Sequence, residues 1–184
     1  MRPRDLVQAN LPKHYLAKLI EDGEVIRLSR GLYQLSEQSV SQWQSYIEVQ
    51  RQVPKGVICL LSALVFHGMT TQNPYEIWVS IDRKDWRPKI AYPPVRYFTV
   101  SGDALSKGVE THVLDGIAVK IFTPAKTVAD CFKYRNKVGL DIAVEALKDG
   151  WKAKKFNMQE LMEMAKICRV EQVMKPYVNS IAHS

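Results

Sequence analysis

The sequence predicts an α+β protein built from two domains, and three observations lead to this fold class. Helical and strand patterns alternate along most of its 184 residues, without an internal repeat. Apolar residues make up 46% and charged residues 24% of the chain, which is typical of a globular protein with a packed core. A polar stretch from 36 to 41 separates a small amino-terminal domain, 1–38, from a larger one, 39–184.

The first 35 residues predict two short helices followed by a β-hairpin. Pro3 and Pro12 each suit the first turn of a helix, Gly23 suits the end of the second helix, and Arg30-Gly31 suits a hairpin turn. This order is that of a winged helix-turn-helix, in which the second helix reads the major groove of DNA and the hairpin is the wing. The expected helices span 2–9 and 12–22, and the expected strands span 25–29 and 32–35.

Cationic and polar side chains fall where a winged helix-turn-helix contacts DNA. Lysines of the second helix would neutralise phosphates, a histidine and a tyrosine near its start would reach base edges, and arginines would steady the wing. The net charge of +7 agrees with a polyanionic partner. Each residue alone also suits an ordinary solvated helix or turn, so the prediction rests on their order along the chain. The predicted DNA-binding residues are Lys13, His14, Tyr15, Lys18, Arg27 and Arg30.

A winged helix normally contains a further helix that packs from upstream. No residue precedes Met1-Arg2-Pro3, so this first helix is missing from the expected set. Either an amphipathic helix over 40–52 takes its place, or the natural start of the protein lies further upstream.

The larger domain is expected to combine a small sheet with several helices. The run 57–66 is nearly all apolar, and its length favours one buried core helix. Asp115-Gly116 gives the strongest hairpin pattern, and Thr123-Pro124 pairs a good N-cap with a proline at the first helical position. The expected strands span 75–81, 95–100, 110–114 and 117–122, and the expected helices span 40–52, 57–66, 125–135, 140–150 and 158 to 167 or beyond.

No set of residues in the sequence predicts catalysis, and we expect neither a metal nor a cofactor. Ser62 and His67 are interpreted as a core-facing serine and a histidine at a helix end. His112, with Glu110 and Asp115 nearby, has the residue types of a metal-dependent nuclease site. The Asp-Gly turn explains Asp115 through the backbone alone, so a nuclease is the weaker alternative.

The cysteines lie far apart in apolar surroundings, so Cys59, Cys131 and Cys168 are expected to be reduced core residues. Asp130 is a single carboxylate that could cap its helix or pair with a neighbour. No run approaches the roughly 20 apolar residues of a membrane span, and the amino terminus lacks the apolar segment of a signal peptide. We therefore expect a cytoplasmic protein without a membrane partner.

Two basic regions, 83–89 and 133–137, interleave cations with aromatic residues. Such interleaving occurs both on nucleic-acid-binding surfaces and in ordinary solvated loops, and the sequence leaves the two interpretations open.

Several motifs follow one another along nearly the whole chain. They are Arg2-Pro3-Arg4-Asp5-Leu6, Pro12-Lys13-His14-Tyr15-Leu16, Arg30-Gly31-Leu32-Tyr33, Val53-Pro54-Lys55-Gly56-Val57-Ile58-Cys59-Leu60-Leu61-Ser62-Ala63-Leu64, Phe66-His67-Gly68 and Thr123-Pro124-Ala125-Lys126-Thr127-Val128-Ala129-Asp130-Cys131. In this order the motifs resemble the AbiEi antitoxin family. The resemblance implies a winged-helix domain joined to a mixed α/β antitoxin domain in a type IV toxin–antitoxin system of abortive-infection phage defence. It also implies a repressor of its own operon, whose partners are operator DNA and a nucleotidyltransferase-like toxin encoded beside it.

How the larger domain would neutralise a toxin is left open, because the residues do not decide between direct contact and antagonism without contact. An alternative hypothesis is a protein-interaction module in which DNA binding is vestigial. We expect a monomer in solution, and pairing on DNA is left open.

Overall fold

The computed structural model describes Ile20 and residues 25–29, 32–35 and 42–182. The chain divides into two compact units, Met1–Gln44 and Ser45–Ser184, and each is considered by itself. The predicted domain boundary between 38 and 39 lies outside the described residues.

The described part of the first unit contains the predicted β-hairpin. Strand β1 (Val25–Ser29) pairs antiparallel with β2 (Leu32–Leu35), and the register shifts between Arg27 and Ser29. The hairpin prediction is therefore confirmed, while its turn at Arg30-Gly31 lies outside the described residues. Of the two helices predicted before it, only Ile20 is described, and it is helical.

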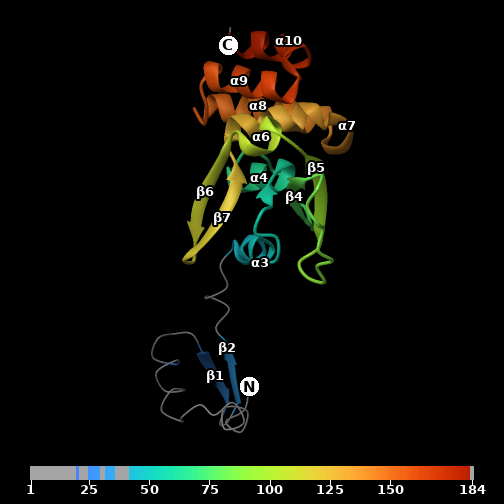
Figure 1. The fold of residues 1–184 in the computed structure, drawn as a ribbon. Coiled ribbons are helices and arrows are strands. Elements are labelled where there is room, and N and C mark those ends of the chain that lie inside the picture. The colour runs from blue at the N-terminus through green and yellow to red at the C-terminus, as the bar shows by residue number, and fades with distance from the viewer. Residues whose placement is uncertain (1–19, 21–24, 30–31, 36–41, 183–184) are drawn as a thin grey trace. The chain divides into compact units, whose positions relative to one another are not determined.

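The second unit is mixed α/β, with a five-stranded sheet in the order β5-β4-β3-β7-β6 (Figure 1). Its middle strand β3 runs antiparallel to β4 and parallel to β7, β4 runs parallel to β5, and β6 and β7 form an antiparallel hairpin. Four strands confirm the predicted ones to within two residues. The strands are β3 (Val57–Ile58), β4 (Ile77–Asp82), β5 (Val95–Val100), β6 (Val109–Leu114) and β7 (Ile117–Phe122).

The prediction of one core helix over 57–66 is wrong at its start. Val57 and Ile58 form β3, Cys59 is the N-cap, and the helix α4 begins at Leu60. Most residues of the two segments are buried, and an almost continuous apolar run carries no periodicity that separates a strand from a helix. The change of direction occurs at Leu60, whose backbone takes a left-handed φ of 47°.

The second unit contributes most of the described helices. Two of them, α5 and α7, are short helices that were not predicted from the sequence as elements of their own. The predicted helix over 125–135 ends earlier, because Tyr134 separates α6 from α7. The helix predicted from 158 ends at Arg169, after which α10 begins. The helices are α3 (Gln44–Gln52), α4 (Leu60–Phe66), α5 (Asp103–Ser106), α6 (Pro124–Lys133), α7 (Arg135–Val138), α8 (Leu140–Lys152), α9 (Met158–Cys168) and α10 (Glu171–Ala182).

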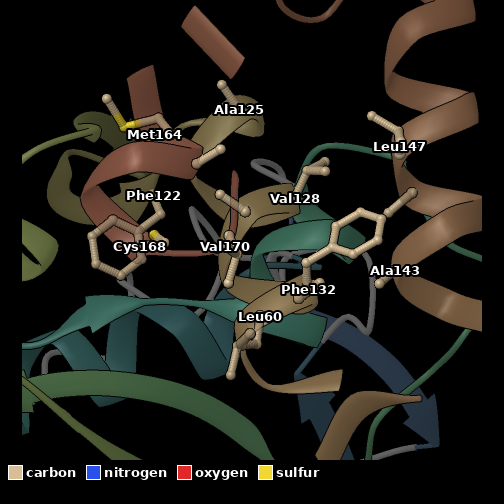
Figure 2. Packing of buried hydrophobic residues seen from close by; sticks show 14 of the residues in the cluster. Leu60, Phe122, Ala125, Val128, Phe132, Ala143, Leu147, Met164, Cys168 and Val170 are labelled. Carbon is tan, nitrogen blue, oxygen red and sulfur yellow. The ribbon is translucent and has the colours of Figure 1, made fainter. Parts of the chain in front are cut away.

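Helix α6 is the centre of the hydrophobic core. Every residue from Ala125 to Phe132 is buried, and α6 packs against α4, α8 and α9. Figure 2 shows Val128 and Phe132 of α6 among side chains of the neighbouring helices, including Ala143 and Leu147 of α8. Figure 1 shows α6 and α8–α10 gathered at one end of the sheet, with α3 at the other end.

The start of α6 follows the sequence signals that predict it. The Thr123 side chain accepts a hydrogen bond from the Lys126 backbone amide, and Pro124 occupies the first turn. This cap begins directly where β7 ends at Phe122, so the strand β7 leads into the core helix without a connecting loop.

The predicted placement of the cysteines in the core is confirmed. Cys59, Cys131 and Cys168 are buried, and none forms a disulfide. Burial raises the pKa of the Cys168 thiol to about 12 and raises the pKa values of the other two as well. At neutral pH the thiols are therefore protonated and poor nucleophiles.

Candidate functional site

The predicted DNA-contacting residues belong to the first unit, and most of them lie outside the described residues. Those outside are Lys13, His14, Tyr15, Lys18 and Arg30. Arg27 is on β1, opposite Tyr33 of β2 in the hairpin register. The described hairpin places Arg27 on a two-stranded ribbon, which is the element expected of the wing.

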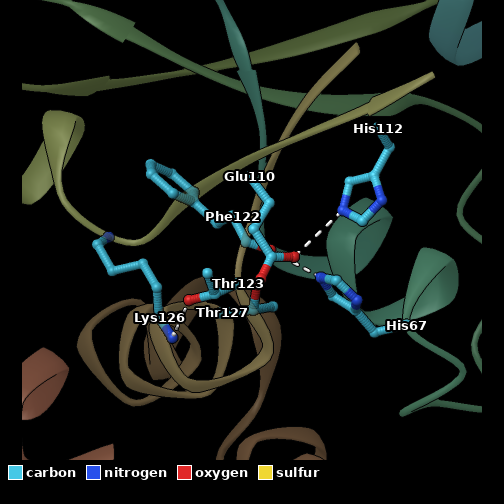
Figure 3. Close-up of polar contacts among 7 residues, drawn as sticks. All are labelled: His67, Glu110, His112, Phe122, Thr123, Lys126 and Thr127. Carbon is cyan, nitrogen blue, oxygen red and sulfur yellow. Dashed lines mark hydrogen bonds and ion pairs between the residues drawn. The ribbon is translucent and has the colours of Figure 1, made fainter. Parts of the chain in front are cut away.

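In the second unit, a polar cluster joins the end of α4 to the β6–β7 hairpin (Figure 3). The Nε2–H of His67 donates to the Phe122 carbonyl oxygen at 2.7 Å. Nearby, His112 pairs with Glu110 at 3.2 Å between Nε2 and Oε2, and its ring packs edge-on against the ring of Phe66. His67 thus fixes the helix end against the last residue of β7.

Burial lowers the pKa of His67 below its ordinary value of 6.5. The hydrogen bond to Phe122 and the Glu110 carboxylate oppose this effect, whereas His112 and Lys155 add to it. The imidazole is therefore neutral at physiological pH and serves as a hydrogen-bond donor through Nε2.

The interpretation of Ser62 and His67 as structural residues is confirmed by their separate partners. The Ser62 side chain is buried, and its Oγ accepts the Trp78 backbone N–H at 2.9 Å. His67 is the residue after α4 and is bonded to Phe122 instead. A serine nucleophile requires its base within hydrogen-bond reach, and here both groups bind backbone elsewhere.

The three residues considered for a nuclease are dispersed along one hairpin. Glu110 and His112 lie on β6 and bind each other, while Asp115 occupies the turn with a left-handed φ of 48° beside Gly116. This backbone geometry is the one that selects Asp-Gly in tight hairpins. Within the described ranges, no group of three or more His, Cys, Asp or Glu side chains is placed to hold a metal ion.

A buried ion pair lies inside α6. Lys126 and Asp130 are one helical turn apart, the Lys126 ammonium contacts the Asp130 carboxylate, and their side chains are 0% and 2% exposed. The other carboxylate oxygen of Asp130 accepts the Cys168 thiol at 3.2 Å, and the ammonium sits 4.1 Å from the centre of the Phe122 ring. Both charges are thus compensated inside the core.

Of the two roles that the sequence left open for Asp130, pairing with a neighbour is the one found, and the partner is Lys126, which the sequence did not single out. The spacing of four residues between a lysine and an aspartate within an apolar helix is the signal that could have found it. Lysine is rarely buried without such a partner, so its position on the fully buried α6 required the pair.

The basic loop 83–89, between β4 and β5, exposes both cations and an aromatic ring. Trp86 is 68% exposed, Asp85 pairs with Lys55 at 3.0 Å, and the Arg87 guanidinium contacts the Thr99 hydroxyl. In the segment 133–137, Lys133 and Arg135 are partly exposed and Lys137 is exposed. The two predicted basic regions therefore differ in how much of their charge faces solvent.

The comparison with known protein families concerns the first unit. Residues 2–36 match the family model described as transcriptional regulator, AbiEi antitoxin. Over these residues the amino-terminal segment is similar to AbiEi antitoxin transcriptional regulators. It includes the described hairpin β1–β2, and it confirms the resemblance predicted from the sequence motifs for these residues. The AbiEi match supports an antitoxin and regulator role for the chain.

No curated protein matches the chain. Among the described helices, none combines the length and apolar character that crossing a membrane requires.

We expect the folded protein to lose stability as pH falls below about 6.5. The unfolded chain binds a proton at His67 at that pH, whereas the folded chain, with its lowered pKa, resists protonation until a lower pH. Urea unfolding between pH 8 and pH 5 measures this, and His67→Gln should flatten the dependence. His112→Gln keeps His67 and serves as the control; an unchanged profile in His67→Gln would contradict this assignment.

Breaking the buried ion pair from one side should be strongly destabilising. Asp130→Leu leaves the Lys126 ammonium buried and unpaired, with an expected loss of about 3–5 kcal/mol in the free energy of unfolding. The double variant Lys126→Met/Asp130→Leu removes both charges and should recover most of that loss. Denaturant unfolding of the single and double variants tests the coupling, and additive losses would show that the two groups do not interact.

Proposed function

We propose that this protein is a DNA-binding repressor of its own operon and the antitoxin of a type IV toxin–antitoxin system. The AbiEi match over residues 2–36 is the observation that carries the proposal, because it falls on the segment whose sequence predicts a winged helix-turn-helix. The described hairpin β1–β2 supports it, since a hairpin after two helices is the wing of that fold.

The reading of DNA is assigned to the second predicted helix and the wing. Lys13 and Lys18 neutralise phosphates, while His14 and Tyr15 lie at the helix start, where base edges of the major groove come within reach. Arg27 and Arg30 of the hairpin contact the backbone or the minor groove. The protein is proposed to be a monomer in solution. Two copies would bind to an inverted repeat in the promoter.

The second unit is assigned the neutralising function. It has a hydrophobic core of its own, with α6 at the centre. The proposed target is a nucleotidyltransferase-like toxin encoded beside this gene in a phage-defence system, and the protein acts as a regulator rather than as an enzyme. This role places it in the cytoplasm with the operator and the toxin.

The DNA-binding proposal is tested by titrating the full chain against its promoter duplex and against a scrambled duplex. Lys18→Ala should weaken binding to both and reduce the slope of log K against log salt by about one unit, because one phosphate contact is lost. Lys175→Ala removes the same charge from an exposed position on α10 and should leave the slope unchanged. Equal affinity for promoter and scrambled duplex at moderate salt would reject operator recognition and favour the interaction-module alternative.

The antitoxin proposal is tested by growth of cells that express the neighbouring toxin gene together with this chain. Wild type and the Lys13→Ala/Lys18→Ala variant should both restore growth, because neutralisation is assigned to residues 45–182 and not to DNA contacts. Growth restored by neither protein would reject the antitoxin role, and rescue by wild type alone would reject the division between the two units.

A further inference from the structure

A polar groove of about 940 Å³ opens beside the end of β5. Its wall comes from three separate parts of the second unit: the segment that follows β5, the junction of α6 with α7, and the junction of α9 with α10. Figure 1 shows β5 reaching the level of α6 and α7 at this end of the sheet. The lining residues are those of 99–104, 133–135 and 167–170, together with Val173.

The charge of the groove is mainly positive. Lys133, Arg135 and Arg169 line it, whereas Asp103 is the one carboxylate among the lining residues. The ion pairs found in the described part of the chain involve other cations, so these three are not neutralised by a carboxylate there. Cations from three different elements thus line one groove beside a single carboxylate, and the Arg135 guanidinium also donates to the Phe132 carbonyl oxygen at 3.0 Å. This excess of positive charge favours an anionic ligand.

Arg169 occupies a position where the backbone favours glycine. It ends α9 in the left-handed conformation, with φ at 59° and ψ at 41°. Glycine is the usual residue at such a helix end because it lacks the Cβ that makes this conformation unfavourable. Arg169 is exposed and lines the groove, so a cationic side chain stands at this position although the backbone there favours glycine.

Part of the groove lining is apolar. Val100, Cys168 and Val170 are buried residues of this lining, and the partly exposed Tyr134 ring adds an aromatic surface. The groove lies at the carboxyl end of β5, the edge strand that runs parallel to β4.

We propose that this groove binds a small ligand that carries a diphosphate or triphosphate group. Guanidinium groups match phosphate oxygens with two parallel hydrogen bonds, and several cations are needed to balance a multiply charged group. The volume is that of a small-molecule site, so a free nucleotide or inorganic polyphosphate fits, and a nucleic acid is not required. The proposal does not depend on DNA reading by the first unit.

Isothermal titration calorimetry of the full chain with ATP and with inorganic tripolyphosphate tests this site. Arg169→Gly and Lys133→Gln should each weaken binding by about tenfold or more, because each removes a charge-assisted hydrogen bond. Lys148→Gln on α8 carries the same charge change at an exposed position away from the groove and should bind as wild type does. Arg169→Gly also relieves the left-handed strain, so it should melt at the wild-type temperature or above, which separates lost binding from lost folding.

The two titrants distinguish the sources of the phosphate group. Tighter binding of ATP than of tripolyphosphate identifies a nucleotide, and equal affinities identify the polyphosphate alone; both outcomes support the site. Absence of binding by either titrant, or affinities unchanged in Arg169→Gly and Lys133→Gln, would overturn the proposal. Weakened ATP binding in Lys13→Ala/Lys18→Ala, with the groove variants unaffected, would place the ligand on the amino-terminal segment and overturn it as well.

Discussion

The second unit depends on the burial of one helix, α6, from Ala125 to Phe132. Polar side chains on a buried helix must find polar partners inside the protein. Lys126 and Asp130 pair with each other, and Asp130 also accepts a hydrogen bond from the Cys168 thiol. Because Thr123 caps α6 directly after β7, the sheet and the helical layer are held by one short connection. His67 then ties α4 to that same junction through the Phe122 carbonyl.

Local chemistry made part of this fold predictable. Asp115-Gly116 and Thr123-Pro124 act through local backbone preferences that do not depend on tertiary structure. As predicted, the first pair forms the turn of a hairpin and the second pair begins the helix α6. The strand β3 was missed because a fully buried run has no polar face to reveal its period. The parallel pairing of β4 with β5 was equally invisible, since it depends on which strands meet across the sheet and not on their own residues.

The functional residues also divide into those that the sequence indicated and those that only the structure brings together. The amino-terminal motifs predicted the AbiEi resemblance, which the family match confirms for residues 2–36, while the individual DNA contacts remain predictions. The sequence indicates 133–137 as a basic region, but not the groove, because Lys133 and Arg169 are far apart in sequence and line one groove only after α6 and α9 pack together. Arg169 carried no signal either, since its left-handed backbone is visible only in the structure.

The account rests on a division of labour in which the amino-terminal segment reads DNA and the larger unit folds around α6. Hydrogen exchange of the full chain, with and without its promoter duplex, tests this division directly. The account predicts that DNA slows exchange within residues 2–36 and that the amides of α6 exchange slowest in both states. Protection confined to residues 45–182, with no change in residues 2–36, would contradict it.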